Sequence, residues 1–530
     1  MEDRQAIEAA LGRGLLLGEV AARNARKFPD KEALIYGDVR LTYKEFNARI
    51  NRLAHAFLDL GIKKGSKVAV MSFNCNQFLE IYFALGKIGG VTVPLNFRLH
   101  GEELVYIVNH SDAQAFVVHE PLLPMVEPMR KDFKNIKDYI SISREPIEGM
   151  LHYESWIPKY PDDEPLVLVN DDDPLFIMYT AGTTGRPKGA VLTHKNEVTM
   201  WMLVSMFATS EPGVGDLTQY RCFVPPPVFH LAGFGIAQLA FFGGATVILS
   251  TEVFNPTDIM QIIEKERVSA ILLIPAMATF LLQLPDLDKY DTSSLRVWVS
   301  GAAILPTATR KQIVQHFPNV RIFDVFGQTE MSPVVCGLRH SESEGRETSV
   351  GKPLSFVEVR VVDDNDNDVP LGEVGEAIYQ GPNVMLEYYK NPEATAEAMR
   401  GGWFHSTDMV RMDEEGYIYI VDRKKDMIIS GGENIYPAEI EDVLYGHPKV
   451  LECAVIGVYD EEWGEAVKAC VVCKPGETMT EEEVAEYCKD HLGSYKKPKS
   501  VDFMDTLPRN AAGKVLKRVL KEQYGKSLRY

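Results

Sequence analysis

The sequence predicts an α/β protein with a large N-terminal domain of helix-flanked, mostly parallel sheets, a β-barrel-like subdomain and a small α+β C-terminal domain. Short apolar runs alternate with helical patterns from residue 43 to residue 300, which predicts parallel strands with helices on both faces. At 530 residues, the chain is long enough for two or three domains. The charged run 422–426 lies between apolar strands, so we expect domains at 1–424 and 425–530, although a charged hairpin turn is the alternative.

The clearest predicted helix covers residues 43–60, where apolar side chains recur at three- and four-residue steps. The apolar runs that follow predict strands at 67–71, 91–93, 115–118, 245–249 and 270–274, with helices around 78–85 and after Pro275. The turn-rich residues 372–392 predict β-hairpins, which we assign to the barrel-like part.

Composition excludes several classes of protein. The net charge of −19 argues against a nucleic-acid partner, so local groups must hold any anionic substrate. Seven scattered cysteines favour a reducing, cytoplasmic location, and we read Cys470 and Cys473 as opposite faces of a core strand. The acidic N-terminus does not resemble a signal peptide, and Pro275 interrupts the longest uncharged run, so we expect no integral membrane segment.

The strand predicted at 174–178 ends in a loop, residues 179–189, with three glycines, three threonines and Lys188. Glycines let backbone N–H groups approach an anion, and threonine hydroxyls and a lysine add donors that suit phosphate. A surface hairpin turn is the alternative. The loop also departs from the ordinary nucleotide-binding pattern, because that pattern needs Ser or Thr directly after its lysine.

This loop resembles the phosphate-binding loop of the adenylate-forming, or AMP-binding, superfamily, which includes acyl-CoA synthetases and peptide-synthetase adenylation domains. Five motifs follow in the family's order between Thr42 and Lys517, and they favour the acyl-CoA synthetase and fatty-acid–CoA ligase branch. Ala181 stands where the family usually has serine, which removes one hydroxyl but keeps the backbone N–H. The resemblance implies that ATP is bound by Thr180, Ala181, Gly182, Thr183, Thr184, Gly185 and Lys188.

Two later strand ends complete the predicted nucleotide site. Small residues after the strand 297–300 either form a tight turn or, as the resemblance implies, a shelf for adenine: Gly301, Ala302 and Ala303. The stretch 324–330 follows, with Asp324, Phe326 and Gly327 assigned to the nucleotide by resemblance and Thr329 as a phosphate donor. Glu330 is a hard oxygen ligand of the kind that Mg²⁺ prefers.

A run of three prolines, 225–227, predicts a stiff extended segment that presents Phe229 and His230. A lone histidine is more often structural, but the resemblance places His230 beside the reacting carboxylate in a positional role. The predicted acyl pocket is apolar, and no Asp or Glu can be placed in it, so we expect a fatty or aromatic acid. Its lining residues are Phe229, His230, Phe234, Met331, Val334 and Val335.

Asp408 and Arg423 precede the predicted boundary, where Asp408 could also be an ordinary turn carboxylate. The resemblance implies that both residues contact the ribose of the nucleotide. It also implies that Lys425 is a hinge and that Gly431 and Gly432 admit the pantetheine arm of coenzyme A, although a strand-to-helix turn would explain these glycines equally well.

The C-terminal stretch reverses the charge of the chain, with ten Lys or Arg against three Asp or Glu between residues 494 and 530. Such a tail is often merely solvated. Lys514 matches the family's adenylation lysine, and we therefore assign it the main catalytic role by resemblance.

Together these features predict an AMP-forming acid–thiol ligase. The enzyme would use ATP, Mg²⁺ and coenzyme A to convert a small apolar carboxylic acid into its adenylate and then its thioester. Two alternatives stay open, an adenylation enzyme that loads a separate carrier protein and an inactive nucleotide-binding regulator. The chain ends soon after Lys514, which favours free coenzyme A. The sequence does not predict an oligomeric state.

Overall fold

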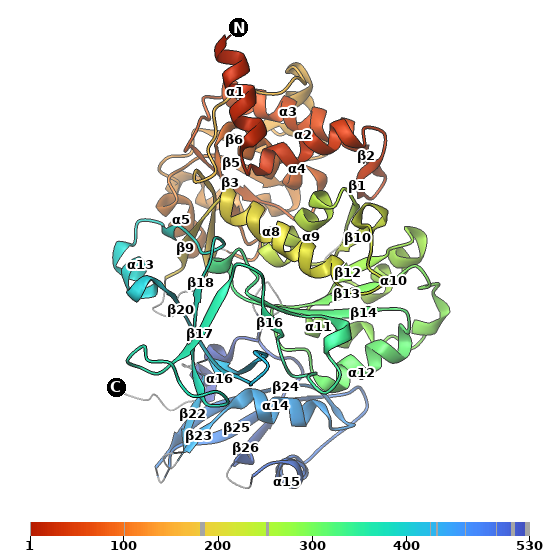
Figure 1. The fold of residues 1–530 in the computed structure, drawn as a ribbon, viewed down its shortest axis with the longest axis vertical. Helices are drawn as coiled ribbons and strands as arrows, with labels where there is room; N and C mark the ends of the chain where they lie inside the picture. Colours follow the sequence, from red (N-terminus) through yellow and green to blue (C-terminus); the bar gives the residue numbers. More distant parts are fainter. Residues whose placement is uncertain are drawn as a thin grey trace.

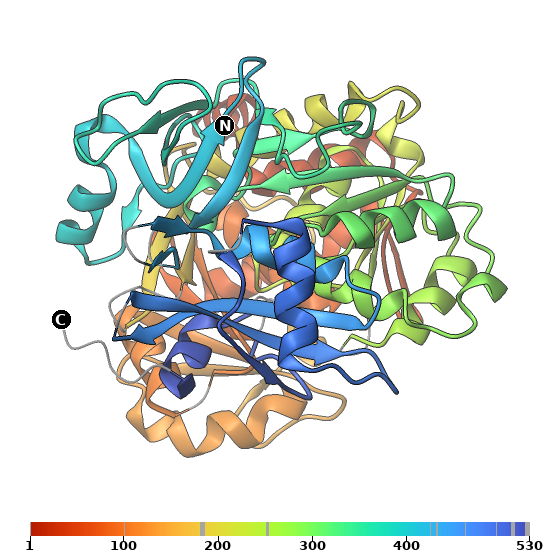
Figure 2. The ribbon, with the colours of Figure 1, turned by 90° about the horizontal axis from the view of Figure 1, so that it is seen from below.

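The computed structural model describes residues 2–99, 101–180, 186–250, 254–423, 426–430, 433–461, 463–493, 496–509 and 515–524. Two large sheets with their helices form the upper part of the molecule in Figure 1, and the C-terminal segment forms a separate lobe below. Seen from below, this lobe lies across the larger part (Figure 2). The predicted mixed α/β class is confirmed.

One large sheet has eight strands in the order β19-β9-β8-β4-β3-β5-β6-β7. The run from β8 to β7 is parallel, whereas β9 pairs antiparallel with both β8 and β19. Its strands are β3 (Lys67–Met71), β4 (Val91–Leu95), β5 (Ala113–His119), β6 (Asp138–Ile142), β7 (Leu151–His152), β8 (Pro174–Thr180), β9 (Lys188–Thr193) and β19 (Glu387–Tyr388).

The other large sheet has nine strands in the order β16-β15-β14-β13-β12-β10-β11-β1-β2. It is parallel from β14 to β1 and antiparallel at both ends. Its strands are β1 (Glu32–Tyr36), β2 (Val39–Thr42), β10 (Arg221–Val224), β11 (Thr246–Leu249), β12 (Ala270–Leu272), β13 (Val297–Ser300), β14 (Arg321–Phe326), β15 (Cys336–Leu338) and β16 (Lys352–Pro353).

Two smaller sheets follow. Four antiparallel strands form the sheet predicted as barrel-like, namely β17 (Glu358–Val362), β18 (Val374–Gln380), β20 (Phe404–Met412) and β21 (Ile418–Arg423). The C-terminal lobe has a five-stranded sheet of β22 (Ile428–Ser430), β23 (Glu433–Ile435), β24 (Val450–Asp460), β25 (Gly464–Cys473) and β26 (Ser500–Phe503). As predicted, Cys470 and Cys473 contribute to different hydrophobic clusters of this lobe.

Helices cover the sheets on both faces. Thr42 caps α3 through a reciprocal bond with Glu45, which explains why that helix starts where its apolar pattern begins. The α-helices are α1 (Glu2–Arg13), α2 (Leu17–Lys27), α3 (Tyr43–Asp59), α4 (Asn76–Ile88), α5 (Gly101–His110), α6 (Leu123–Val126), α7 (Tyr153–Trp156), α8 (His194–Thr209), α9 (Leu231–Phe242), α10 (Pro256–Lys265), α11 (Pro275–Leu281), α12 (Thr307–His316), α13 (Pro392–Ala398), α14 (Pro437–Tyr445), α15 (Glu481–His491) and α16 (Lys517–Tyr524).

Short 3₁₀ turns connect several elements: η1 (Glu120–Leu122), η2 (Glu127–Asp132), η3 (Ile157–Lys159), η4 (Leu217–Gln219), η5 (Leu287–Lys289), η6 (Thr329–Met331), η7 (His340–Glu342) and η8 (Arg400–Gly402).

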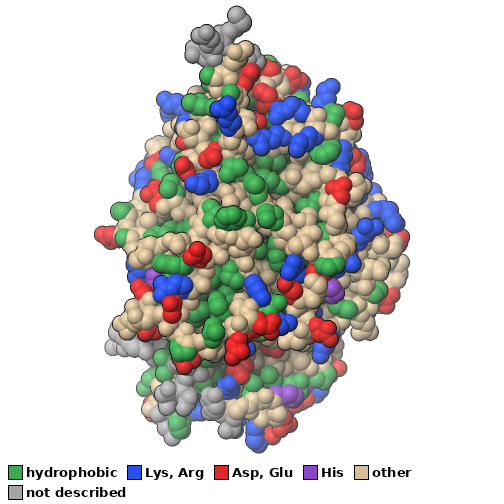
Figure 3. All heavy atoms as spheres, in the orientation of Figure 1, with side chains coloured by type: hydrophobic (Ala, Val, Ile, Leu, Met, Phe, Trp, Pro, Cys, Tyr) green, Lys and Arg blue, Asp and Glu red, His purple; other side chains and the backbone are tan. Residues whose placement is uncertain are grey.

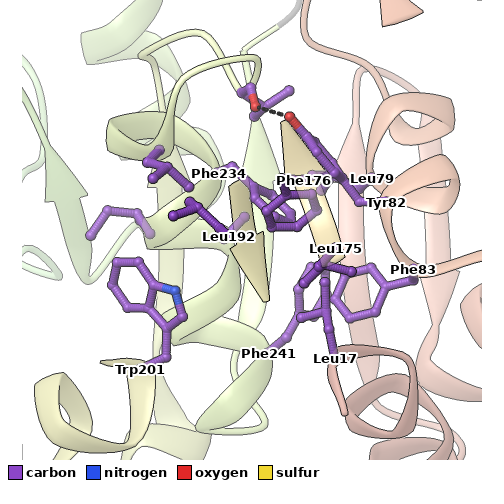
Figure 4. Packing of buried hydrophobic residues seen from close by; sticks show 14 of the residues in the cluster. Leu17, Leu79, Tyr82, Phe83, Leu175, Phe176, Leu192, Trp201, Phe234 and Phe241 are labelled. Carbon is purple, nitrogen blue, oxygen red and sulfur yellow. Dashed lines mark hydrogen bonds between the residues drawn. The ribbon is translucent and has the colours of Figure 1, made fainter. Parts of the chain in front are cut away.

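Aromatic side chains fill the core beside α4 and α9. Tyr82 of α4 stacks on Phe234 of α9 with ring centroids 3.9 Å apart, and Phe176 of β8 packs against both rings (Figure 4). This contact joins the two large sheets, because β8 belongs to one sheet and α9 connects two strands of the other. The site described below lies on loops that this core supports.

The surface carries charges of both signs, interspersed on the face in Figure 3, with hydrophobic side chains gathered near its middle. Met202 and Met206 of α8 are among the exposed apolar residues. Within the described ranges, no helix is both long and apolar enough to cross a membrane.

The structure adds one turn to the predicted local structure and corrects one expectation. After the proline run 225–227, residues 228–229 form a turn in which the His230 N–H bonds to the Pro227 carbonyl at 3.2 Å. Residues 381–392 do not close a hairpin on β18. Instead, β19 crosses to the eight-stranded sheet and pairs with β9. In both cases a partner distant in sequence decides the backbone path.

Candidate active site

The predicted phosphate loop connects two paired strands. Thr180 at the end of β8 lies opposite Lys188 at the start of β9 in an antiparallel register. Strands β8 and β9 therefore form a hairpin, which is the geometry of the surface hairpin turn that the sequence also allowed. The predicted residues Ala181, Gly182, Thr183, Thr184 and Gly185 lie outside the described residues.

Glu330 lies directly against this hairpin, although 150 residues separate it from Thr180. It is carried by η6, the turn after β14, and its side chain is buried. Thr180 Oγ1 is 3.4 Å from Glu330 Oε1, and the Tyr388 hydroxyl donates to the same oxygen at 2.9 Å. Lys188 Nζ lies 5.2 Å from the centre of the Tyr388 ring. A carboxylate, two hydroxyls and an ammonium group thus converge at one corner.

The chemistry of this corner fits Mg²⁺ bound with a phosphate. Mg²⁺ is commonly held by one or two carboxylates together with substrate phosphate oxygens and water. Among the described residues, no group of three or more His, Cys, Asp or Glu side chains could hold a metal alone. Glu330, the predicted ligand, would therefore act together with the phosphates. Thr329 precedes it on η6 and is half-buried.

The predicted adenine shelf lies at the end of β13. Gly301 is buried, and a Cβ there would lie 2.9 Å from Val325, so the chain packs tightly at this point. Ala302 and Ala303 are exposed, and Ala302 has a φ of 67°. The two alanines turn the backbone outward at the strand end, as either a shelf or a tight turn requires.

The neighbouring strand β14 carries the other predicted nucleotide residues. Asp324 is buried and forms an ion pair with Arg310 of α12. Burial raises the pKa of Asp324, and Arg310 opposes this shift. Phe326 is half-buried at the strand end, and Gly327 packs so closely that a Cβ would meet the Pro333 carbonyl oxygen at 2.1 Å.

His230 and Phe229 lie on the turn between β10 and α9. Asn74 fixes this turn, since its side chain donates to the Pro226 carbonyl at 3.0 Å and accepts from the Val228 N–H at 2.8 Å. The rings of Phe229 and His230 are 5.0 Å apart. Burial lowers the pKa of His230 to about 4, so the imidazole is neutral at neutral pH.

The other predicted pocket residues sit deeper. Phe234 stacks on Tyr82, and Met331 and Val335 are fully buried, with Val334 nearly so. Asn383 holds their loop by donating to the carbonyls of Met331 and Val334 at 2.9 and 3.2 Å. These side chains are brought together in the core beneath η6.

Asp408 and Arg423 are direct partners in the antiparallel pair of β20 and β21. Asp408 is buried, and its N–H bonds to Ser406 Oγ at 3.0 Å. Lys425, Gly431, Gly432 and Lys514 lie outside the described residues.

Sequence reasoning missed four residues that shape this site: Tyr388, Asn74, Asn383 and Glu197. The first three act through backbone or carboxylate partners far along the chain, which no local pattern indicates. Glu197 of α8 is a carboxylate that the sequence analysis did not consider, and it is fully buried and close to Ser332, which follows the predicted pocket residue Met331. Its only sequence signal is a carboxylate in the first turn of a helix whose later turns are mostly apolar.

Comparison with known families agrees with this geometry. A family model described as AMP-binding enzyme matches residues 21–389, and a second, AMP-binding enzyme C-terminal domain, matches residues 439–514. A feruloyl-CoA synthase from Amycolatopsis sp is 38% identical over 511 residues, covering 96% of this chain and 99% of the relative. A long-chain-fatty-acid–CoA ligase from Mycobacterium tuberculosis is 37% identical over 491 residues, covering 92% and 94%.

Solved structures give the same result. The anthranilate CoA ligase AuaEII, crystallised with anthranoyl-AMP, aligns with a TM-score of 0.91 at 27% identity and covers 97% of this chain and 98% of that one. A Mycobacterium tuberculosis fatty acyl CoA synthetase aligns with a TM-score of 0.75 at 34% identity, covering 96% and 98%. The resemblance predicted from the motifs is confirmed, and the chain belongs to the AMP-binding enzyme family, as an AMP-forming acid–thiol ligase of its acyl-CoA synthetase branch.

Proposed function

We propose that this chain is an ATP-dependent acyl-CoA synthetase for an apolar carboxylic acid, either a medium- or long-chain fatty acid or an aromatic acid. The observation that carries the proposal is the convergence of Glu330, Thr180, Lys188 and Tyr388 at one corner. The Glu330 carboxylate suits a metal ion, and the Lys188 ammonium group beside a glycine-rich hairpin suits the phosphates of a metal-bound triphosphate.

In the first step, the carboxylate of the acid attacks the α-phosphorus of ATP. The new O–P bond forms as the bond to the bridging oxygen breaks, which gives an acyl-adenylate and pyrophosphate. Negative charge builds up in the transition state, so catalysis depends on positioning and electrostatic stabilisation. Lys188 on the hairpin and Lys514 from the C-terminal segment are the proposed cations, with Thr329 and the glycine-rich loop as donors.

Glu330 is the proposed holder of Mg²⁺, which when bound would neutralise charge on the phosphates. Tyr388 orients the Glu330 carboxylate by donating to Oε1. Asp408 and Arg423 are proposed to contact the ribose, while Gly301, Ala302, Ala303, Asp324, Phe326 and Gly327 form the proposed adenine side.

His230 is proposed to position the acid rather than act as a base. A neutral imidazole neither repels a positive charge nor holds a negative charge of the bound substrates. Asn74 fixes the turn that carries His230. The apolar pocket of Phe229, Phe234, Met331, Val334 and Val335 supports an aromatic or fatty acid. The relatives point the same way, since they include feruloyl, long-chain-fatty-acid and indoleacetate ligases.

In the second step, the thiol of coenzyme A attacks the acyl carbon, and AMP leaves. We propose domains 1–424 and 425–530, with rotation at Lys425 exchanging Lys514 for the Gly431–Gly432 turn at the site between steps. A separate carrier protein as acceptor is the alternative. The cytoplasmic location inferred from the cysteines and a role in fatty acid metabolism stay predictions.

The test is AMP release from ATP and Mg²⁺ with a panel of fatty and aromatic acids, comparing free coenzyme A with a carrier protein as acceptor. We expect acid-dependent AMP release and a CoA thioester product. Thioester on the carrier alone would favour the carrier-loading alternative. Absence of acid-dependent pyrophosphate exchange with every acid would leave an inactive nucleotide-binding regulator.

A further inference from the structure

Beneath the loop that carries Glu330 lies a set of buried polar side chains, here called the Glu197 cluster: Glu197 and Trp201 of α8, Gln238 of α9, and Ser332. Glu197, Gln238 and Ser332 are fully buried, and Trp201 is 3% exposed. Trp201 Nε1 and Gln238 Nε2 both donate to Glu197 Oε2, at 3.2 and 2.8 Å. One carboxylate oxygen is therefore well satisfied.

The rest of the cluster is not satisfied. Glu197 Oε1, Gln238 Oε1 and Ser332 Oγ each lack a hydrogen-bond partner within the part of the chain that the structure describes. Ser332 lies close enough to lower the pKa of Glu197, yet the two side chains form no hydrogen bond. Buried polar atoms are nearly always paired, because an unpaired one loses its bond to water without replacing it. Three such atoms on three segments indicate a missing partner.

The unpaired atoms define the chemistry of that partner. Gln238 Oε1 accepts hydrogen bonds, as does Glu197 Oε1 when the carboxyl is ionised, and the Ser332 hydroxyl can accept as well. A hydroxyl or an amine can donate to such a set, whereas a hydrocarbon would leave every member unpaired. A lone buried water is the competing occupant.

Residues of the Glu197 cluster on three segments of the chain lie next to proposed acyl-pocket residues or to the helix that carries them. Gln238 lies one helical turn beyond Phe234 on α9, so both project from the same face. Trp201 packs against the same helix, since a Cβ on Gly235 would lie 2.4 Å from its ring. Ser332 follows Met331 directly in the loop after η6. Gln238 follows His230, the N-cap of α9, by eight positions, or about 12 Å along the helix axis.

We propose that the Glu197 cluster is a subsite for a hydrogen-bond-donating substituent, a hydroxyl or an amine, at the end of the acid remote from its carboxylate. This inference rests on the proposed function and refines its substrate class from apolar acids to acids with one polar terminus. The length of α9 between His230 and Gln238 matches a donor at the far end rather than one beside the reacting group.

The experiment compares matched acids in AMP release with free coenzyme A. The pairs are para-hydroxyphenylpropanoate and para-aminophenylpropanoate, each against phenylpropanoate, and omega-hydroxydecanoate against decanoate. We expect kcat/KM to favour the donor-bearing acid by about tenfold or more in at least one pair. Glu197→Leu and Gln238→Leu should each lower this ratio by about tenfold, because the acceptors are then removed from two separate helices.

Met202→Ser is the matched control, since Met202 lies on α8 but is 47% exposed, and its ratio should equal that of the wild type. Thermal unfolding of every variant separates misfolding from a change in preference, and Gln238→Leu keeps the test valid if Glu197→Leu does not fold. Ratios near one in the wild type, or ratios that both variants leave unchanged, would overturn the inference in favour of a buried water. Failure of all acids would instead refute the proposed function.

Discussion

The Tyr388 hydroxyl donates to Glu330 Oε1 at 2.9 Å, which connects the strand β19 to the turn η6. The same tyrosine pairs through its backbone with Ala190 of β9, and Lys188 Nζ lies over its ring. One residue therefore contacts the proposed metal ligand, the hairpin of the phosphate loop and the loop lysine. Burial, with Glu330 close by, raises the pKa of Tyr388, so the phenol stays a hydrogen-bond donor.

We expect Tyr388→Phe to lower the rate of adenylation roughly 10- to 100-fold, since a hydrogen bond to a charged group contributes about 1.5–3 kcal/mol. The variant should also need more Mg²⁺ for half-maximal rate, because Glu330 loses the donor that orients it. Acid-dependent pyrophosphate exchange over a Mg²⁺ titration measures both effects.

The neighbouring Tyr389 provides the matched control. Its hydroxyl donates to Asp112 at 2.8 Å, away from Glu330, so Tyr389→Phe removes one half-buried phenol without touching the proposed metal ligand. An equal loss in both variants, with no change in Mg²⁺ dependence, would show that Tyr388 only stabilises the fold.

Lys514→Ala should abolish adenylation while leaving thioester formation from supplied acyl-adenylate largely intact. Loss of one charge that stabilises the first transition state should cost roughly 3–4 kcal/mol, by analogy with loss of one oxyanion donor. Rapid-quench assays of each half-reaction provide the measurement. If both half-reactions slowed equally, Lys514 would not be specific to the first step.

Asp442→Ala should change the balance between the two half-reactions. The carboxylate of Asp442, on α14 of the C-terminal lobe, accepts from the Thr307 N–H at the start of α12 at 3.3 Å. An oxygen acceptor at a helix N-terminus contributes about 0.5–2 kcal/mol. Its removal should therefore destabilise this orientation of the C-terminal lobe relative to other orientations. Single-turnover rates of adenylation and thioester formation should then shift in opposite directions.

Glu439→Ala is the corresponding control, because Glu439 lies on the same helix but pairs with Lys496 inside the lobe. Parallel changes in both half-reactions for Asp442→Ala would contradict the role of this contact in lobe orientation.

The Glu197 carboxyl should make stability fall as pH rises. Burial raises the pKa of Glu197 from 4.5 to about 7, while hydrogen bonds from Gln238 and Trp201 and the nearby Ser332 hydroxyl oppose the shift. Between these values the native state keeps a proton that the unfolded chain has released, so the free energy of unfolding decreases with increasing pH. The full effect is about 3 kcal/mol, at 1.36 kcal/mol for each pKa unit.

Glu197→Gln removes this titration. The difference in unfolding free energy between variant and wild type, from urea denaturation at pH 5 and pH 8, should grow by about 2–3 kcal/mol in favour of the variant. The neighbours will not mask the effect, because Gln238, Trp201 and Ser332 are neutral and the pKa of the facing Tyr82 is raised well above this range. A constant difference would mean that Glu197 titrates normally.

Elements with strong local patterns were predictable from sequence. The helix expected at 43–60 is α3 at Tyr43–Asp59, and the strand expected at 67–71 is β3 with the same bounds. Periodicity succeeds here because one face packs on the core. Periodicity carries no signal for the turn after the proline run, which Asn74 fixes through bonds to Pro226 and Val228.

The candidate site was predictable only in its linear motifs. Glu330 and Thr180 carried recognisable patterns, but Tyr388 and Asn383 gain their roles through contacts 58 and 52 residues away. Glu197 was passed over because a charged side chain on a helix is usually solvated, and only its packing against α9 reveals that it is buried.

The position of β1 has a consequence for biosynthesis. This strand, completed by Tyr36, pairs in parallel with β11, which begins at Thr246. During translation, an early hydrophobic strand must therefore wait for a partner made more than two hundred residues later, with only the short β2 beside it. Such long-range pairing folds slowly and exposes nascent chains to aggregation. Ribosome-stalled fragments ending before residue 246 should bind chaperones more strongly than fragments ending beyond β11.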